Sequence, residues 1–179
     1  MCKQKAVFFD RDGVINIPKI IKNTPYPPKK FKDLVLYRQV KNCIYNLKKY
    51  KFKTIIITNQ PDYKRGLVQK NEIIKINSYI KKIFNIDKVY VCYDTSNKSF
   101  FKKPNPGMII SAKKKFNLNL KSSFIIGDTE KDILAGKRSG CKTILLKKKY
   151  NYHYKNIANY YVENLNEATK TIINTINEK

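Results

Sequence analysis

Short apolar runs recur along the chain, and polar turns separate them. Five of these runs are rich in isoleucine, valine and phenylalanine: Ala6–Phe9, Lys53–Thr58, Lys88–Cys92, Ser123–Ile126 and Lys142–Leu146. Within each run the apolar residues are continuous rather than alternating, which is typical of strands buried on both faces of a parallel sheet. The pattern therefore predicts a parallel sheet built from these five strands.

Apolar residues at helical spacing lie between the runs. They form three stripes: Val40, Cys43, Ile44 and Leu47; Ile73, Ile76, Ile80 and Ile83; and Met108, Ile109, Ala112 and Phe116. Two more helices are predicted over Glu130–Ser139, where Gly140 can supply a C-terminal cap, and over Leu165–Ile176. Strands that alternate with helices predict an α/β fold with a doubly wound parallel sheet and right-handed crossovers.

The chain shows neither an internal repeat nor an interdomain linker, so we expect residues 1–179 to form a single domain. Two loops are long, the proline-rich segment Asn16–Asp33 and the segment Tyr93–Pro106. Long loops in a compact domain commonly carry function or act as a lid. The stretch from Gly13 to Thr58 must already hold a loop, a helix and a strand, so no large cap domain is expected and the site should be open.

The composition excludes several classes of protein. Hydrophobic residues make up 42% of the chain, enough for a core, which rules out a disordered tail. No apolar stretch approaches the ~20 residues that span a bilayer, and the apolar run near the N-terminus is too short for a signal peptide. The four cysteines are scattered and the single histidine lies far from them, which suits a reducing compartment. We therefore expect a cytoplasmic protein without a membrane partner.

The net charge of +25 first suggests a nucleic-acid partner. However, 34 of the 38 basic residues are lysine, whereas specific nucleic-acid binding relies on arginine for bidentate contacts. The chain also holds 24 isoleucines and 19 asparagines, and all three residue types have A/T-rich codons, so a biased genome explains the composition. We expect only weak, non-specific binding of nucleic acid, although the field would steer a small phosphorylated substrate.

Polar residues follow four of the predicted strands, at the end where ligands bind in such folds. The segments are Asp10-Arg11-Asp12-Gly13, Thr58-Asn59-Gln60, Lys102-Lys103-Pro104 and Gly127–Asp132. They hold four of the eight aspartates of the chain, which is informative in a protein so poor in acid. The functional site is therefore predicted at this edge of the sheet.

The chemistry of these residues indicates phosphoryl transfer. Asp10 and Asp12 leave a strand two residues apart, so their side chains point the same way, and Asp128 can converge on them. Clustered carboxylates repel one another unless a cation neutralises them, and oxygen ligands without nearby histidine or cysteine favour Mg²⁺. With the hydroxyl of Thr58 and the ammonium of Lys103, the set suggests an aspartyl-phosphate mechanism.

Each feature has a simpler explanation when it stands alone. Asp12-Gly13 is a turn signal, and Asp128 and Asp132 suit the first turn of a helix. Thr58 suits an N-terminal cap, and Lys103 is one lysine among 34. The four motifs nevertheless occur in order, each after a predicted strand, and this joint pattern favours an enzyme.

The motifs together resemble the haloacid dehalogenase superfamily. They are Phe8–Asn16, Thr58-Asn59-Gln60, Arg65-Gly66, Lys103–Met108 and Gly127–Asp132, and the similarity runs from about Val7 to Leu146. Within the superfamily they resemble the branch of the D-glycero-D-manno-heptose 1,7-bisphosphate 7-phosphatases and the histidinol-phosphate phosphatases. The resemblance implies a phosphoric monoester hydrolase of carbohydrate metabolism, acting on a small phosphorylated metabolite, with heptose bisphosphate first.

The resemblance also implies roles for the aspartates. Asp10 would be the nucleophile, and Asp12 would protonate the leaving alkoxide and then activate water. Mg²⁺ would be bound by the side chains of Asp10 and Asp128 and by the backbone carbonyl of Asp12. Asp132 would orient the catalytic lysine or a metal-bound water.

The remaining motif residues would bind the substrate. Thr58 and Asn59 would bind phosphoryl oxygens, and Lys103 would neutralise charge on the nucleophile and on the transferred group. Three further residues match substrate-binding positions: Gln60, Arg65 and Lys102.

The chain departs from this branch at the zinc loop, which commonly holds three cysteines and a histidine. Only Cys92 matches, with nine residues between it and Lys102, so we expect Mg²⁺ and no zinc. The Arg-Lys-Pro-His of the branch is here Lys102-Lys103-Pro104-Asn105, which replaces a fork-shaped donor by a point charge. These departures leave the residues for phosphatase chemistry intact, but they weaken the inference to any one sugar as the substrate.

Two other functions stay open. A polynucleotide 3′-phosphatase shares the same motifs and is favoured by the charge, although the excess of lysine over arginine counts against it. A catalytically silent module could instead bind nucleic acid through the basic segment Lys147–Lys155, whose tyrosines could stack on bases. The intact set of motif aspartates and Lys103 argues against a silent protein. We expect the chain to be a monomer.

Overall fold

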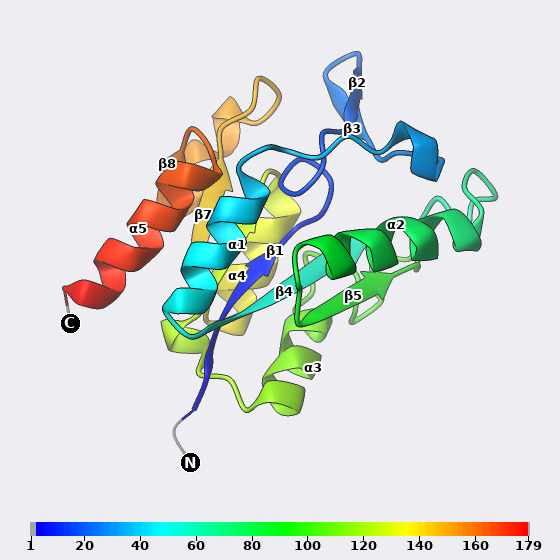
Figure 1. Ribbon diagram of the computed structural model, residues 1–179. Helices are drawn as coiled ribbons and strands as arrows, with labels where there is room; N and C mark the ends of the chain where they lie inside the picture. Colours follow the sequence, from blue (N-terminus) through cyan, green and yellow to red (C-terminus); the bar gives the residue numbers. More distant parts are fainter. Residues whose placement is uncertain (1–2, 179) are drawn as a thin grey trace.

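The computed structural model describes residues 3–178 and is built around one six-stranded sheet (Figure 1). The strand order is β5-β4-β1-β6-β7-β8, and all neighbouring strands are parallel. The strands are β1 (Lys5–Phe9), β4 (Phe52–Asn59), β5 (Lys88–Cys92), β6 (Phe124–Gly127), β7 (Lys142–Leu146) and β8 (Tyr160–Val162). All five predicted strands are confirmed. The sequence missed β8, a half-buried edge strand of three residues that is too short to show a pattern.

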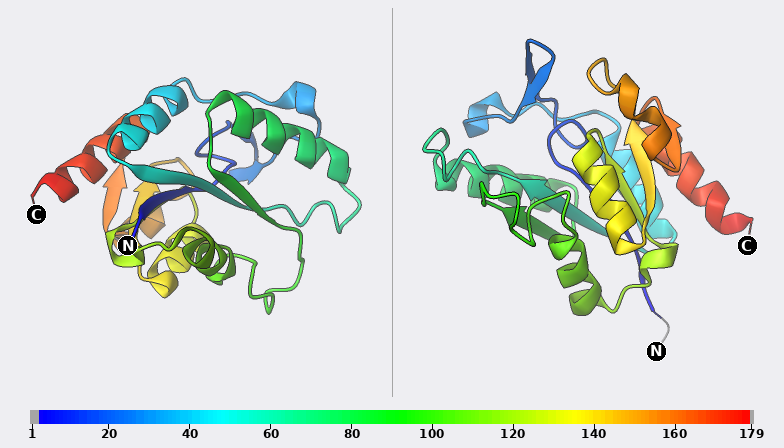
Figure 2. Two further views of the ribbon diagram at one scale, coloured as in Figure 1. Left: turned by 60° about the horizontal axis from the view of Figure 1, so that its bottom comes forward. Right: turned by 180° about the vertical axis from the view of Figure 1, so that it is seen from behind.

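Helices cover both faces of the sheet (Figures 1 and 2), which confirms the predicted doubly wound α/β fold. The helices are α1 (Val40–Lys49), α2 (Lys70–Ile83), α3 (Gly107–Phe116), α4 (Glu130–Ser139) and α5 (Leu165–Asn177). One face packs against α1, α2 and α5, and the other against α3 and α4. Three short 3-10 helices, η1 (Phe31–Asp33), η2 (Leu120–Ser122) and η3 (Tyr152–Ile157), lie in the connections.

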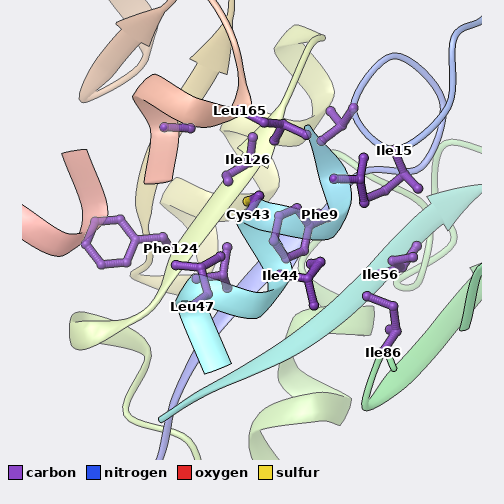
Figure 3. Close-up of a cluster of buried hydrophobic side chains, with 14 of the residues drawn as sticks. Phe9, Ile15, Cys43, Ile44, Leu47, Ile56, Ile86, Phe124, Ile126 and Leu165 are labelled. Atoms are coloured by element: carbon purple, nitrogen blue, oxygen red, sulfur yellow. The ribbon is translucent and has the colours of Figure 1, made fainter. Parts of the chain in front are cut away.

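The central strand β1 shows how the sequence builds two hydrophobic cores. Val7 and Phe9 pack into the cluster beneath α1, which Figure 3 shows in close-up, whereas Ala6 and Phe8 pack into the cluster on the opposite face. All four side chains are completely buried. A strand apolar on both faces must lie in the middle of a layered sheet, which is where β1 lies.

Two details of the helix and strand predictions were wrong. Ile83, placed on the apolar stripe of α2, is exposed at the last turn of the helix, and the polar residue Asn77 is buried on that stripe instead. Strand β5 is only half-buried because it forms an edge of the sheet.

The proline-rich segment Asn16–Asp33 contains a β-hairpin where the sequence predicted only a loop. Its strands are β2 (Lys19–Ile21) and β3 (Thr24–Tyr26), and Figure 1 shows it beyond the carboxyl end of β1. The turn residues Lys22 and Asn23 have φ of 47° and 60°, the left-handed conformation that two-residue hairpin turns require.

The hairpin is the main addition to the α/β core, and residues 3–178 form no large cap domain, as predicted. Within the same described range, every helix is too short or too polar to cross a bilayer.

Candidate active site

The predicted site residues meet at the carboxyl end of the parallel sheet. Asp10 follows β1, Asn59 ends β4, and Asp128 follows β6, while the loop after β5 brings in Lys103. Their side chains line a pocket of about 530 Å³, and one of its walls is formed by Thr24–Pro27 at the hairpin. The edge of the sheet thus brings together four motifs that lie far apart in the sequence.

A buried lysine joins two of the carboxylates. Lys103 Nζ lies 2.7 Å from Asp10 Oδ1 and 2.6 Å from Asp132 Oδ1, and it donates a third hydrogen bond to the backbone carbonyl of Ile57 at 3.0 Å. All three hydrogens of the ammonium group therefore have acceptors, and its direction is fixed. Breaking such a buried, fully bonded ion pair leaves an uncompensated charge.

Carboxylates outnumber cations in the buried part of the site. Burial raises the pKa of Asp10 to about 7, although the neighbouring Lys103 opposes this shift. Burial also raises the pKa of Asp128, and the charges of Asp10 and Asp132 add to the effect. Burial would lower the pKa of Lys103, but the two carboxylates outweigh it and raise that pKa. The site lacks one or more positive charges when its carboxylates are ionised.

The donor set fits a hard divalent cation. One carboxylate oxygen from each of Asp10, Asp128 and Asp132 lies within 4.8 Å of the others. Both oxygens of Asp132 are already engaged, one by Lys103 and the other by the backbone N–H and hydroxyl of Thr129 at 3.0 and 2.6 Å. Asp128 Oδ1 is buried and accepts no hydrogen bond in the described part of the chain. The open oxygens belong to Asp10 and Asp128, and an all-oxygen set of this kind suits Mg²⁺.

Asp12 is held by a second, separate network. Its carboxylate accepts hydrogen bonds from Arg11 at 3.0 and 3.1 Å, from Asn16 at 3.0 Å and from Gln60 at 2.7 Å. Arg11 is completely buried and also donates to Asn77 of α2 at 3.0 Å. Asp12 and Asp10 both line the pocket.

Two glycines allow the carboxylates to approach the backbone. Gly13 has φ of +93°, and a Cβ added there would lie 2.0 Å from Asp128 Oδ2. A Cβ at Gly127 would lie 2.1 Å from the Cβ of Asp132. Any side chain at either position would displace an aspartate of the cluster.

The motif at the end of β4 forms hydrogen bonds with other residues of the site. Thr58 and Gln60 are buried, and the Gln60 amide donates to the Thr58 hydroxyl at 2.9 Å as well as to Asp12. Asn59 lines the pocket, and its amide exchanges two hydrogen bonds with the backbone of Lys103, at 3.0 and 3.1 Å. Gln60 therefore orients Asp12, and Asn59 orients Lys103.

Besides Lys103, three cationic side chains line the pocket: Arg65, Lys102 and Lys131. Arg65 is half-exposed and paired with Asp62 at 3.1 Å. Lys102 donates to the backbone carbonyl of Thr95 and to the side-chain oxygen of Asn97, and these bonds anchor the loop after β5. Arg65 and Lys102 were predicted from the sequence, but Lys131 was not. Nothing in the sequence distinguished Lys131 from the many other lysines of the chain.

Side-chain hydrogen bonds hold the loop Tyr93–Pro106, which stands where the heptose phosphatase branch commonly has its zinc loop. Asp94 accepts from Lys64 and from the Ser99 hydroxyl, the latter at 2.6 Å, and the Cys92 thiol lies 4.0 Å from its carboxylate. Asn105 donates to the carbonyl of Ser99 at 2.9 Å. Side-chain contacts of this chain therefore shape the loop, and the expectation of no zinc stays a prediction.

Sequence reasoning missed several residues of the site. Arg11 and Asn16 lie inside the first motif, Phe8–Asn16, but the motif did not indicate that both side chains donate hydrogen bonds to Asp12. Asn77 gave a usable signal, because a polar residue on the apolar stripe of a helix usually has a buried partner. Tyr150, whose hydroxyl donates to Asp128 Oδ2, gave none.

Comparisons with known proteins point to one family. Residues 4–146 match the family of haloacid dehalogenase-like hydrolases. The D-glycero-beta-D-manno-heptose-1,7-bisphosphate 7-phosphatase of Helicobacter pylori is 32% identical over 153 residues, which cover 82% of this chain and 85% of that protein. The D-glycero-alpha-D-manno-heptose-1,7-bisphosphate 7-phosphatase of Burkholderia mallei is 33% identical over 157 residues, 80% of each chain.

A solved structure agrees in fold. The D,D-heptose 1,7-bisphosphate phosphatase from B. bronchiseptica, complexed with magnesium and phosphate, matches with a TM-score of 0.81. The match covers 96% of this chain and 99% of that one, at 19% sequence identity. At this identity the likeness supports the α/β fold alone.

Proposed function

Because this chain belongs to the haloacid dehalogenase-like hydrolase family and is a phosphatase, we propose that it hydrolyses a small sugar phosphate through an aspartyl-phosphate. The observation that carries the proposal is the buried Lys103, which holds Asp10 and Asp132 beside Asp128 in one open pocket. A carboxylate can act as the nucleophile that accepts a phosphoryl group, and the bond from Lys103 fixes the position of this one.

Asp10 performs the covalent step in this proposal. Asp10 Oδ1, beside the Lys103 ammonium group, attacks phosphorus while the bond from phosphorus to the sugar oxygen breaks, which leaves Oδ2 for a cation. Lys103 stays in place throughout because Asn59 holds its backbone and Asp132 holds its ammonium group. Its charge then offsets the charge of the transferred phosphoryl group.

Asp12 moves the protons. It gives a proton to the sugar oxygen that leaves, and then takes one from the water that attacks the aspartyl-phosphate, which regenerates Asp10 and releases phosphate. Arg11, Asn16 and Gln60 engage the Asp12 carboxylate in the structure. Asp12 must therefore exchange one of these donors for the substrate oxygen before it can act.

Asp10 and Asp128 would hold Mg²⁺ through their open oxygens, with the backbone carbonyl of Asp12 as a third ligand. When bound, Mg²⁺ neutralises charge on the phosphoryl oxygens. The unpartnered, buried Asp128 Oδ1 supports this assignment. Asp132 stays with Lys103 and Thr129, so its role is to orient the lysine.

The leading substrate is D-glycero-D-manno-heptose 1,7-bisphosphate, with removal of the 7-phosphate. Relatives named for the alpha and for the beta anomer match this chain about equally well, so the proposal covers both anomers. The cationic residues Arg65, Lys102 and Lys131 that line the pocket support a substrate with a second anionic group. Thr58 is completely buried and its hydroxyl accepts a hydrogen bond from the Gln60 amide, and its assignment to a phosphoryl oxygen stays a prediction.

The test is a comparison of kcat/KM for purified protein with Mg²⁺ on both heptose bisphosphate anomers, histidinol phosphate and a 3′-phosphorylated oligonucleotide. We expect a heptose bisphosphate to be hydrolysed best, with phosphate released from the 7-position. A preference for the oligonucleotide would identify a polynucleotide 3′-phosphatase instead, and a preference for histidinol phosphate would move the chain to that activity. Metal analysis of the same preparation tests the expectation of no zinc: one tightly bound zinc ion per chain would contradict it.

A further inference from the structure

The basic segment that follows β7, Lys147–Lys155, reaches into the active site. We propose that Tyr150 and Asn151 of this segment are positioning residues for Asp128, and that Tyr150 thereby sets the affinity of the site for its divalent cation. The inference rests on the proposed role of Asp128 as a metal ligand. It gives a structural task to a segment whose lysines and tyrosines first suggested nucleic-acid binding.

Two adjacent residues hold Asp128 at two points. The Tyr150 hydroxyl donates to Asp128 Oδ2, and the Asn151 amide donates to the Asp128 backbone carbonyl at 2.8 Å. One contact fixes the carboxylate and the other fixes the main chain that carries it. Asp128 is thus held at its carboxylate and at its backbone carbonyl by a segment that follows it by about twenty residues in the sequence.

This segment is itself held in place. Asn151 is buried and donates a second hydrogen bond to the carbonyl of Leu146, while its side-chain oxygen accepts from the backbone of Lys148 at 2.9 Å. The Lys148 ammonium group bonds the hydroxyl of Tyr37 at 2.8 Å and lies 4.4 Å from the centre of its ring. Asn151 therefore closes a compact turn at the end of β7, and Lys148 attaches this turn to the segment before α1.

The contacts of the three clustered carboxylates show why Tyr150 matters for a cation. Asp132 has both oxygens engaged, and Asp10 has one oxygen on Lys103. Tyr150 occupies one oxygen of Asp128 and leaves Oδ1 buried and open. The hydroxyl thus fixes which oxygen of Asp128 is presented to a cation. Residues that orient a metal ligand in this way commonly change metal affinity by about 10- to 100-fold when they are removed.

Tyr150 also borders a side hollow of about 210 Å³, next to the hairpin residues Asn23 and Thr24. A substrate group entering this hollow could touch Tyr150 directly. That alternative predicts a change in the KM for substrate rather than in the affinity for the cation, so the two roles can be separated.

The experiment measures binding of Mn²⁺, as a spectroscopic substitute for Mg²⁺, to the substrate-free protein by electron paramagnetic resonance and calorimetry. The variants are Tyr150→Phe, which deletes only the hydroxyl, and Tyr152→Phe as a matched control. Tyr152 is exposed and its hydroxyl bonds only Lys155 in the described residues. Asp128→Asn reports on the metal site itself, and circular dichroism checks that every variant is folded.

We expect Tyr150→Phe to raise the dissociation constant for Mn²⁺ about 10-fold, with Tyr152→Phe unchanged. At saturating Mg²⁺, Tyr150→Phe should recover most of its kcat, and its KM for substrate should stay unchanged. Unaltered Mn²⁺ binding by Tyr150→Phe would overturn the inference, as would a raised KM at unaltered Mn²⁺ affinity. If Asp128→Asn bound Mn²⁺ as the unmodified protein does, the proposed metal site itself would fall, which is a different failure.

Discussion

Ion clusters lie at both ends of the central sheet, and they are built in opposite ways. At the amino end, Asp87 accepts hydrogen bonds from Lys48 and Lys53, each at 3.3 Å, and from the backbone N–H and hydroxyl of Thr54 at 2.9 and 3.0 Å. At the carboxyl end, the ammonium group of Lys103 bonds Asp10 and Asp132, and the carboxylate of Asp128 lies in the same cluster. One end has more cations than carboxylates, and the other has more carboxylates than cations.

Burial sharpens the difference. The Asp87 side chain is 18% exposed, whereas that of Asp132 is 1% exposed. Burial raises the pKa of Asp87, but the bonds from Thr54 and the charge of Lys48 outweigh it, so that pKa is lowered. In the active site burial prevails, and the pKa of Asp10 rises to about 7. Aspartate and lysine thus form a stabilising ion cluster at one end of the sheet and a cluster with excess buried negative charge at the other.

Asp10→Asn and Asp87→Asn test this contrast with the largest expected effect. Asp10→Asn should lower kcat by at least about 10³-fold, because an amide cannot accept the phosphoryl group. Its melting temperature without metal should equal or exceed that of the unmodified protein, since one buried charge is removed. Asp87→Asn should keep kcat within about twofold and lose about 1–2 kcal/mol of stability. Phosphate-release assays and thermal unfolding measure both; normal turnover by folded Asp10→Asn would exclude covalent catalysis by that residue.

Lys103→Met and Lys53→Met compare the loss of one lysine from the cluster at each end of the sheet. Lys103→Met leaves buried carboxylates without their cation, so we expect a loss of about 3 kcal/mol in the free energy of unfolding and at least about 10²-fold in kcat. Lys53 is partly exposed, and its replacement should cost less than about 1 kcal/mol. Urea unfolding and initial rates test the pair. Equal losses of stability in the two variants would show that the two clusters are alike after all.

The pH dependence of metal binding follows from Asp10. Its pKa is raised in the folded protein, so the folded state binds its proton more tightly than the unfolded chain does. The stability that this group contributes is complete below about pH 4 and is lost as the pH rises through about 7. Mg²⁺ competes with that proton, so the rise in melting temperature on adding Mg²⁺ should be larger at about pH 8 than at about pH 5.5. A metal effect independent of pH would contradict this.

The smallest expected effect is that of DNA on the hydrolysis of a sugar phosphate. Lysines crowd the amino end of the sheet, where Lys3, Lys5, Lys48, Lys51 and Lys53 line one hollow. We expect single-stranded DNA to bind weakly there at low salt and to be released at about 0.15 M salt, because such binding rests on counterion release. At that salt, DNA should change sugar-phosphate hydrolysis by less than about twofold. Strong inhibition under these conditions would mean that DNA reaches the catalytic end.

The strands, the helices and the chemical class of the site could be predicted from the sequence because their signals are local. Continuous apolar runs such as Ala6–Phe9 describe a buried strand whatever surrounds it, and the residues after each run lie at one edge of a parallel sheet. The hairpin at Lys19–Tyr26 was missed because its strands are short and exposed and therefore show no hydrophobic period.

The sequence by itself determined which side chains gather at the carboxyl edge, including Asp10, Lys103 and Asp128. Only the tertiary structure decided which hydrogen bonds these side chains form. Both carboxylate oxygens of Asp132 accept hydrogen bonds from Lys103 and Thr129. Asn59 bonds the backbone of Lys103, and the Tyr150 hydroxyl bonds Asp128. The physical reason is that a hydrogen bond depends on positions within a few tenths of an ångström. Such positions are set by the packing of segments as far apart as Asp10 and Lys103, which no local pattern encodes.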